Sequence, residues 1–131
     1  IRKFEAMGTR SFPSELAIGT AIEFHKMIGR ERKEARLRYL KDYWMDGIRD
    51  IPGIYFHTSM KPEFSCGLGN FGIEGMEPAD IQKKLMGDYR IYTISINWEN
   101  IHGLRVTPNV YITTEDLDRF ISAVKEIAAS A

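Results

Sequence analysis

Arg105 is the residue whose type and position best suit a chemical role. Strand alternation places its neighbours Leu104 and Val106 together on one face of a short apolar segment. Arg105 and Thr107 then lie on the opposite face, away from the core. A guanidinium on a rigid strand can make two parallel hydrogen bonds to a carboxylate. The residues alone therefore leave two interpretations, a carboxylate-binding site at Arg105 or an arginine on a solvated sheet face.

The histidines and the single cysteine show no metal-ligand spacing. His25, His57 and His102 are far apart in the sequence, and Cys66 has no neighbouring ligand. His25 falls in a segment that we expect to be a buried helix, which indicates a core residue. His102 lies just before Arg105 and is the one histidine that we place near a site. Cys66 alternates with apolar neighbours, so we predict a buried, unreactive thiol.

Residues 67–72 match the pattern GxGxxG. This motif binds dinucleotides when its glycines lead directly into a helix whose N-terminus holds the phosphates. Here the glycines fall within a strand-like alternation, and the next helix is expected only at Pro78. We therefore interpret the segment as a strand that another element crosses closely, and not as a nucleotide site.

The composition is that of one globular domain without a preference for polyanions. The chain has 131 residues, of which 44% are hydrophobic, and its 18 basic and 18 acidic residues cancel. The basic run from Arg30 to Lys41 is interrupted by acidic residues, which favours a solvated helix face over a nucleic-acid surface. We expect neither a membrane span nor a signal peptide, and the lone cysteine predicts a reducing, cytoplasmic location.

The elements that position Arg105 are expected in the order helix, helix, strand, strand, helix, strand, strand, helix. This order predicts an α+β fold, with a small antiparallel or mixed sheet covered on one face by helices. The terminal helix is the clearest element, because Thr113 or Thr114 can cap it and its apolar residues recur at helical spacing. The expected helices are 14–28, 30–48, 78–87 and 114–128, and the expected strands are 54–58, 64–73, 89–96 and 104–107.

Two segments together resemble class V pyridoxal-phosphate enzymes of fold type I. The first, similar to the family's FE-x-GT segment, is Phe4-Glu5-Ala6-Met7-Gly8-Thr9-Arg10. The second, residues 104–118, is similar to the family's C-terminal segment R-x-S/T-P-x-x-Y-x-T-x-x-D-(L/I)-D. The resemblance implies that residues 1–13 end a large-domain segment and that residues 14–131 form the C-terminal small domain.

The resemblance also implies roles for three residues. Arg105 would bind the α-carboxylate of an amino-acid-type substrate, and Gly8 and Thr9 would lie near the phosphate of pyridoxal 5′-phosphate, across a homodimer. The family's cofactor-binding lysine, its aspartate and its ring-stacking residue belong upstream of Ile1. We therefore expect no catalytic residue in this chain. The 131 residues alone are expected neither to be active nor to hold the cofactor tightly.

The loop expected before Arg105 limits which reactions of this family we expect. Desulfurases and selenocysteine lyases carry a reactive cysteine there, whereas residues 97–103 contain none. The chain is most similar to isopenicillin N epimerase-like members, so epimerase, lyase and aminotransferase reactions stay open. The alternative hypothesis is a free-standing, non-catalytic structural or interaction domain derived from such an enzyme.

Overall fold

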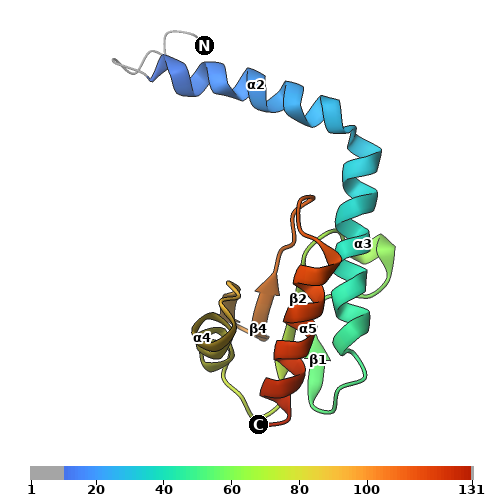
Figure 1. Cartoon of the computed structure of the whole chain (residues 1–131), viewed down its shortest axis with the longest axis vertical. Coiled ribbons are helices and arrows are strands. Elements are labelled where there is room, and N and C mark those ends of the chain that lie inside the picture. Colours follow the sequence, from blue (N-terminus) through green and yellow to red (C-terminus); the bar gives the residue numbers. More distant parts are fainter. Residues whose placement is uncertain (1–10, 131) are drawn as a thin grey trace. The chain divides into compact units, whose positions relative to one another are not determined.

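The computed structural model describes residues 11–130 and divides the chain into two compact units, residues 1–33 and 34–131. The described part of the first unit contains helix α2 (Phe12–Ile28) and the start of helix α3 (Arg30–Ile48). The second unit contains the rest of α3, the whole sheet and the two remaining helices (Figure 1).

Helix α2 differs from the buried helix that we expected. None of its residues is buried, and Leu16 is 76% exposed. His25 is exposed as well, with its Nδ1 3.1 Å from Nζ of Lys33, so its assignment to the core was wrong. The physical reason is that residues 11–33 contain no second layer against which these apolar side chains could pack.

The second unit is built on a four-stranded antiparallel sheet with the strand order β1-β2-β4-β3. Helix α4 (Pro78–Tyr89), helix α5 (Thr114–Ala128) and the C-terminal half of α3 pack on one face of it. The predicted α+β fold, with helices on one face, is confirmed. The strands are β1 (Ile54–Phe56), β2 (Gly69–Ile73), β3 (Ile94–Trp98) and β4 (Ile101–Val106).

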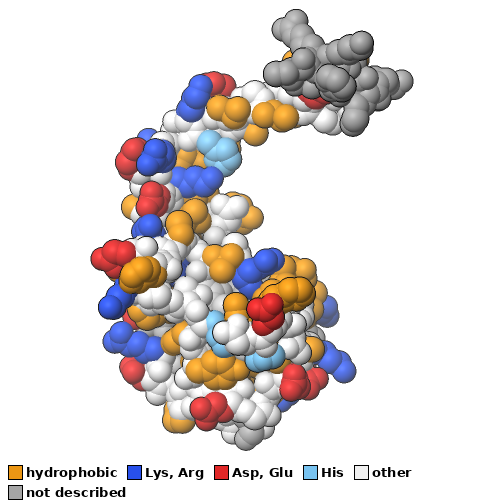
Figure 2. Space-filling model, turned by 180° about the vertical axis from the view of Figure 1, so that it is seen from behind, with side chains coloured by type: hydrophobic (Ala, Val, Ile, Leu, Met, Phe, Trp, Pro, Cys, Tyr) orange, Lys and Arg blue, Asp and Glu red, His pale blue; other side chains and the backbone are white. Residues whose placement is uncertain are grey.

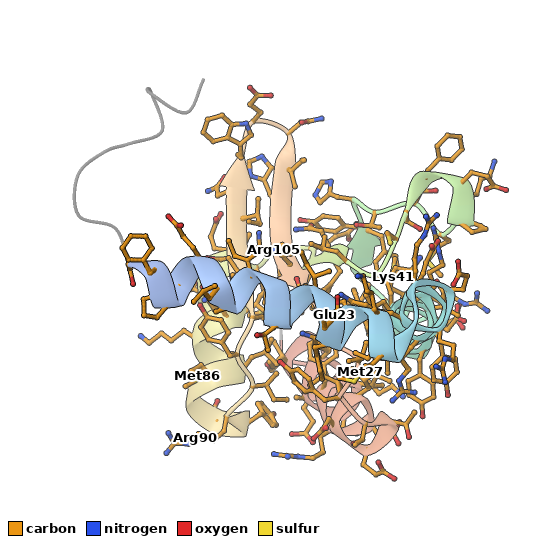
Figure 3. All side chains as sticks on the ribbon, turned by 90° about the horizontal axis from the view of Figure 1, so that it is seen from above. Glu23, Met27, Lys41, Met86, Arg90 and Arg105 are labelled. Carbon is orange, nitrogen blue, oxygen red and sulfur yellow. The ribbon has the colours of Figure 1, made fainter. Side chains whose placement is uncertain are left out.

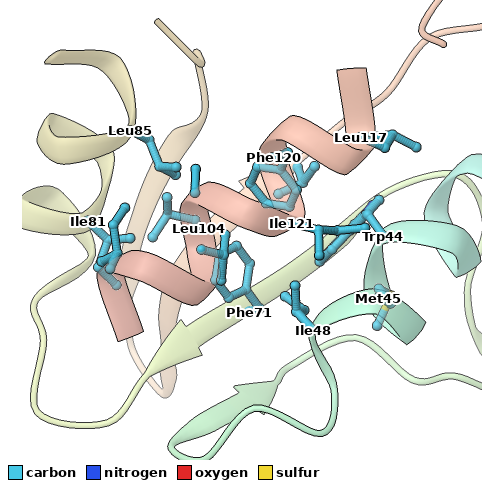
Figure 4. Close-up of a cluster of buried hydrophobic side chains, with 14 of the residues drawn as sticks. Trp44, Met45, Ile48, Phe71, Ile81, Leu85, Leu104, Leu117, Phe120 and Ile121 are labelled. Carbon is cyan, nitrogen blue, oxygen red and sulfur yellow. The ribbon is translucent and has the colours of Figure 1, made fainter. Parts of the chain in front are cut away.

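Apolar side chains from the three helices meet on this covered face (Figure 4). Trp44 of α3 lies 5.8 Å from Phe71 of β2 and 5.7 Å from Phe120 of α5, measured between ring centroids. The register places Phe71 opposite Leu104 of β4, and both are fully buried. The core therefore fixes the strand that carries Arg105.

Thr113 caps α5 and is one of the two caps that the sequence predicted. Its hydroxyl accepts a hydrogen bond from the backbone N–H of Asp116 at 3.2 Å, and the Asp116 carboxylate accepts one from the N–H of Thr113 at 3.1 Å. This reciprocal pair is a capping box. The bond from the Thr113 backbone lowers the pKa of Asp116, because it favours the ionised carboxylate.

The segment before β2 corrects two predictions. A short 3-10 helix, η1 (Pro62–Phe64), stands where a strand was expected, and β2 begins only at Gly69. Cys66 lies in this loop and is exposed, so the predicted buried thiol was wrong. The Nζ of Lys41, a residue only 1% exposed, donates to the Ser65 hydroxyl at 2.8 Å and holds the loop on α3 outside the pleat.

The connection before Arg105 is shorter than expected. Where the sequence predicted a loop over residues 97–103, β3 and β4 form a hairpin whose turn is Glu99 and Asn100. Helix α4 also extends to Tyr89, and Arg90 ends it in a left-handed conformation with φ of 59°. For this reason β3 starts later than the predicted strand over residues 89–96.

Candidate functional site

The sheet face opposite the helices carries Arg105 on a central strand. Its neighbours Leu104 and Val106 are buried on the helix-covered face, whereas Arg105 lies on the open face and is half-buried. Figure 3 shows Arg105 among the side chains of the sheet. The predicted alternation along this strand is therefore confirmed.

The charge of Arg105 has no counter-ion within residues 11–130. Its guanidinium makes no hydrogen bond or ion pair in this part of the chain, and its Nε is buried without a partner. Burying a donor without an acceptor costs about 1–3 kcal/mol, and more for a charged group. A cation held in this way is available to bind an anion from the open face.

Asn70 of β2 is the cross-strand neighbour of Arg105. The register places the two Cα atoms opposite each other, so both side chains lie on the open face. Asn70 is 7% exposed, and its Oδ1 is also buried without a hydrogen-bond partner. The open face therefore contains a charged donor and a neutral acceptor on facing residues.

Two glycines let side chains lie flat on this open face. A Cβ added at Gly103 of β4 would overlap Oδ1 of Asn70 and the carbonyl oxygen of Phe71. A Cβ at Gly72 of β2 would overlap the ring of Tyr55. The glycines thus make room for the polar side chains that cross the sheet.

Tyr55 of β1 and His57, which follows this strand, reach over β2 to β4. The Tyr55 hydroxyl donates to the carbonyl oxygen of His102 at 2.8 Å, and Nε2 of His57 accepts from the N–H of His102 at 3.2 Å. The ring of His102 is bound elsewhere, with Nδ1 2.6 Å from Oδ1 of Asn97. His102 therefore takes part in a network that ties the strands together, three positions along β4 from Arg105.

Most of the GxGxxG segment is a strand, as we interpreted it. Its last four residues belong to β2, and the following helix begins at Pro78. A Cβ at Gly69 would lie 2.5 Å from Cζ2 of Trp44, and one at Gly67 would lie 2.7 Å from Cβ of Leu37. Helix α3 therefore passes close to these glycines, which explains them without a nucleotide.

A surface cavity of about 320 Å³ lies beside α5 and does not include Arg105. Its lining residues include Thr93, Val106 and Phe120, which lie on or near the helix-covered side of the sheet. Tyr111 and Arg119 also line it. The unpaired charge lies on the open face instead, which is therefore the candidate site.

Gly8 and Thr9 lie outside the described residues. The acidic and basic side chains alternate on the surface seen in Figure 2, and Arg38 pairs with Glu34 at 3.0 Å on α3. Within residues 11–130, no group of three or more His, Cys, Asp or Glu residues could hold a metal ion. In the same range, every helix is too short or too polar to cross a membrane.

Sequence analysis missed Asn70, Tyr55 and His57. The alternation of Asn70 and Gly72 with Phe71 and Ile73 was a signal that β2 has one polar face. It did not reveal that Asn70 faces Arg105, because that pairing depends on β4 inserting between β2 and β3.

Comparisons with known proteins identify the family of this chain. The family described as Aminotransferase class-V matches residues 1–120. Isopenicillin N epimerase of Streptomyces clavuligerus is 30% identical over 125 residues, which cover 95% of this chain and 31% of that protein. The chain thus spans about a third of the length of the curated relatives that it matches.

Solved structures share the fold. The apo structure of a cysteine desulfurase from Thermococcus onnurineus NA1 is similar with a TM-score of 0.83 and 18% identity, covering 95% of this chain and 33% of that one. A mutant of C-DES with glycine covalently linked to its PLP cofactor has a TM-score of 0.77 and 17% identity, covering 91% and 30%. Because the family pattern matches most of its length, the chain belongs to the aminotransferase class V family.

Proposed function

We propose that this chain is the C-terminal third of a pyridoxal-phosphate-dependent enzyme that acts on an amino acid, and that Arg105 binds the substrate's α-carboxylate. The observation that carries the proposal is the half-buried, unpaired guanidinium on a central strand. A carboxylate is the planar anion that a guanidinium binds best, through two parallel hydrogen bonds. Family membership and the similarity to isopenicillin N epimerase support an amino-acid-derived substrate.

In our proposal the described residues do not hold the cofactor by themselves. Lys41 is their one fully buried lysine, and its Nζ already donates to Ser65 and pairs with Asp42 at 2.8 Å. It also lies on the helix that covers the other face of the sheet. In our proposal the lysine that holds the cofactor comes from the rest of the enzyme. Gly8 and Thr9 would then contact the cofactor phosphate across a homodimer.

The reaction is proposed to be an epimerisation, lyase or transamination step and not a desulfuration. Cys66 lies in the loop between β1 and β2, whereas the hairpin that precedes Arg105 contains no cysteine. A thiol in the first loop is on the far side of β2 from that hairpin. The position of Cys66 thus supports the exclusion of desulfuration, which we predicted because residues 97–103 contain no cysteine.

The test uses the enzyme that carries this chain, expressed from the coding sequence together with its upstream frame. Replacing Arg105 by alanine removes a charge-assisted partner of the substrate carboxylate. We expect kcat/KM for the amino-acid substrate to fall at least about tenfold, equivalent to 1.4 kcal/mol or more. Arg105→Lys should restore only part of this loss, because an ammonium does not reproduce the fork.

Arg90→Ala is the matched control. Arg90 is an exposed arginine of the same unit, at the end of α4, and its removal should leave the kinetics unchanged. Wild-type kinetics in Arg105→Ala would overturn the assignment of the carboxylate site. An upstream frame without a lysine-bearing domain would overturn the proposal that the chain is part of such an enzyme.

A further inference from the structure

We propose that Asn70 is a positioning residue for Arg105. Its Oδ1 accepts the Nε–H of Arg105 and turns the guanidinium so that the two terminal nitrogens meet a carboxylate end-on. This inference rests on the proposed function, because it explains how the same arginine presents its charge. It adds a residue that contacts the arginine and not the substrate.

The backbone shows that Asn70 and Arg105 form a close pair. The N–H of Asn70 donates to the Thr58 hydroxyl at 2.9 Å, and its carbonyl oxygen accepts from the N–H of His57 at 3.1 Å. Both backbone groups of Asn70 therefore point toward β1 and away from β4. In an antiparallel ladder this makes Asn70 and Arg105 a non-hydrogen-bonded pair, whose Cα atoms are about 4.5 Å apart and whose side chains lie closest.

The two unpartnered atoms are complementary. Within residues 11–130 the structure has four buried side-chain nitrogen or oxygen atoms without a partner, and two of them are Nε of Arg105 and Oδ1 of Asn70. The other two belong to Trp44, which lies in the core, and to Thr93. Because Ile94 pairs with Arg105, Thr93 belongs to the opposite face of the sheet. On the open face these atoms are thus one donor and one acceptor on facing residues.

The side chains need only rotate to make the bond. Asn70 and Arg105 are not hydrogen-bonded in this structure, and Oδ1 of Asn70 lies over Gly103, one pleat away from Arg105. Gly103 leaves room there because it has no Cβ. Nε is enclosed while Arg105 as a whole stays half-exposed, so the terminal nitrogens are the part that reaches solvent. That orientation favours end-on recognition of a carboxylate.

The experiment measures hydrogen exchange at Nε–Hε of Arg105 by ¹⁵N NMR on the full 131-residue chain. We expect a protected Hε in the wild type, and exchange at least about tenfold faster in Asn70→Leu, which has similar volume but no acceptor. Asn70→Asp keeps the acceptor and should keep Hε protected. Thr93→Val is the matched control, since it removes a buried unpartnered hydroxyl from the opposite face and should leave Hε unchanged.

A second readout separates this inference from the proposed function. Acetate, added as a carboxylate probe, should shift the Arg105 side-chain signals, and its affinity should fall several-fold in Asn70→Leu. In Asn70→Asp the affinity for acetate should fall further, because the new carboxylate itself pairs with the Arg105 guanidinium. If acetate does not shift the Arg105 signals of the wild type, the proposed carboxylate site is contradicted. The comparison of Hε exchange still decides the role of Asn70.

Equal Hε exchange in the wild type and Asn70→Leu would overturn the inference. If Asn70→Leu does not give a dispersed spectrum, Asn70→Ala replaces it, with the same expected loss of protection. An equal loss of protection in Thr93→Val would also overturn it, because the effect would then reflect general loosening of the sheet.

Discussion

The two faces of the sheet use the same strands for different purposes. On the covered face, Phe71 and Leu104 are fully buried against α3, α4 and α5, and aromatic rings pack edge to face. On the open face, one pleat away on the same strands, Asn70 and Arg105 keep polar atoms that have no partner. Strand periodicity makes this division possible, because successive residues point to opposite faces.

The difference shows where stability and binding are separated in this domain. Burial on the covered face stabilises the fold and holds β4 in place, because the core is closely packed. The open face buries few apolar side chains and carries an uncompensated cation at a rigid position. Substitutions on the two faces should therefore affect different measurements.

The largest expected effect is on the covered face. Phe71→Ala removes a ring that contacts both Trp44 and Phe120, at centroid distances of 5.8 and 5.9 Å. We expect the free energy of unfolding to fall by about 3–5 kcal/mol, measured by urea denaturation. Ile94→Ala on the open face is the matched control and should cost less than half as much, because Ile94 is only half-buried. Equal losses would mean that both faces belong to one core.

The covered face was the part that sequence could predict. Thr113 and the apolar spacing of residues 117–127 fixed α5, and the alternation of Leu104, Arg105 and Val106 fixed the faces of β4. These are local patterns with a local physical cause. The polar neighbours of Arg105 were not predictable in this way, because they depend on which strands become adjacent.

The sequence also could not predict which side chains other segments would bury. The apolar residues of α2 indicated a buried helix, yet burial depends on a partner that residues 11–33 do not contain. The loop around Cys66 imitated strand alternation, but its bonds to α3 take it out of the sheet. The domain boundary at residue 13 and the roles of Gly8 and Thr9 stay predictions.

A smaller effect is expected at the cap that anchors α5 on the covered face. Thr113→Ala removes the hydroxyl of the capping box and should lower the free energy of unfolding by about 1 kcal/mol. The pKa of Asp116 is lowered in the folded state, first by the Thr113 backbone N–H and then by its hydroxyl. The folded state thus favours the ionised carboxylate, and this stabilisation is present above the ordinary aspartate pKa.

Acid should therefore reduce the contribution of this cap. As the pH falls below the ordinary aspartate value and through the lowered pKa of Asp116, the stabilisation is lost. Thermal unfolding of wild type and Thr113→Ala at neutral and strongly acidic pH should show their difference shrinking with acid. A difference that grows with acid would contradict the capping box as the source.

On the open face, Arg105→Met should leave the domain as stable as the wild type or slightly more stable. The change keeps an apolar side chain of adequate length and removes a half-buried charge without a counter-ion, which offsets the loss of the proposed bond from Nε to Oδ1 of Asn70. Urea denaturation should give a change within about 0.5 kcal/mol or a gain. A loss comparable to that of Phe71→Ala would show that Arg105 is a structural residue, and would contradict both the carboxylate site and the solvated-face interpretation.

The smallest effect is expected at Cys66, which marks where the covered face ends. Because the residue is exposed in the loop between β1 and β2, Cys66→Ser should leave the unfolding midpoint unchanged. For the same reason a thiol reagent should label the native chain at nearly the rate of the unfolded chain. Slow labelling that speeds up only on unfolding would place the thiol under the helices, and would return residues 64–68 to the sheet as the alternation of Phe64, Cys66 and Leu68 had predicted. The Lys41–Ser65 bond provides the internal comparison. Ser65→Ala should loosen the loop on α3 and raise the labelling rate further. Ser59→Ala in the same loop, whose hydroxyl accepts from the N–H of Lys61, should not.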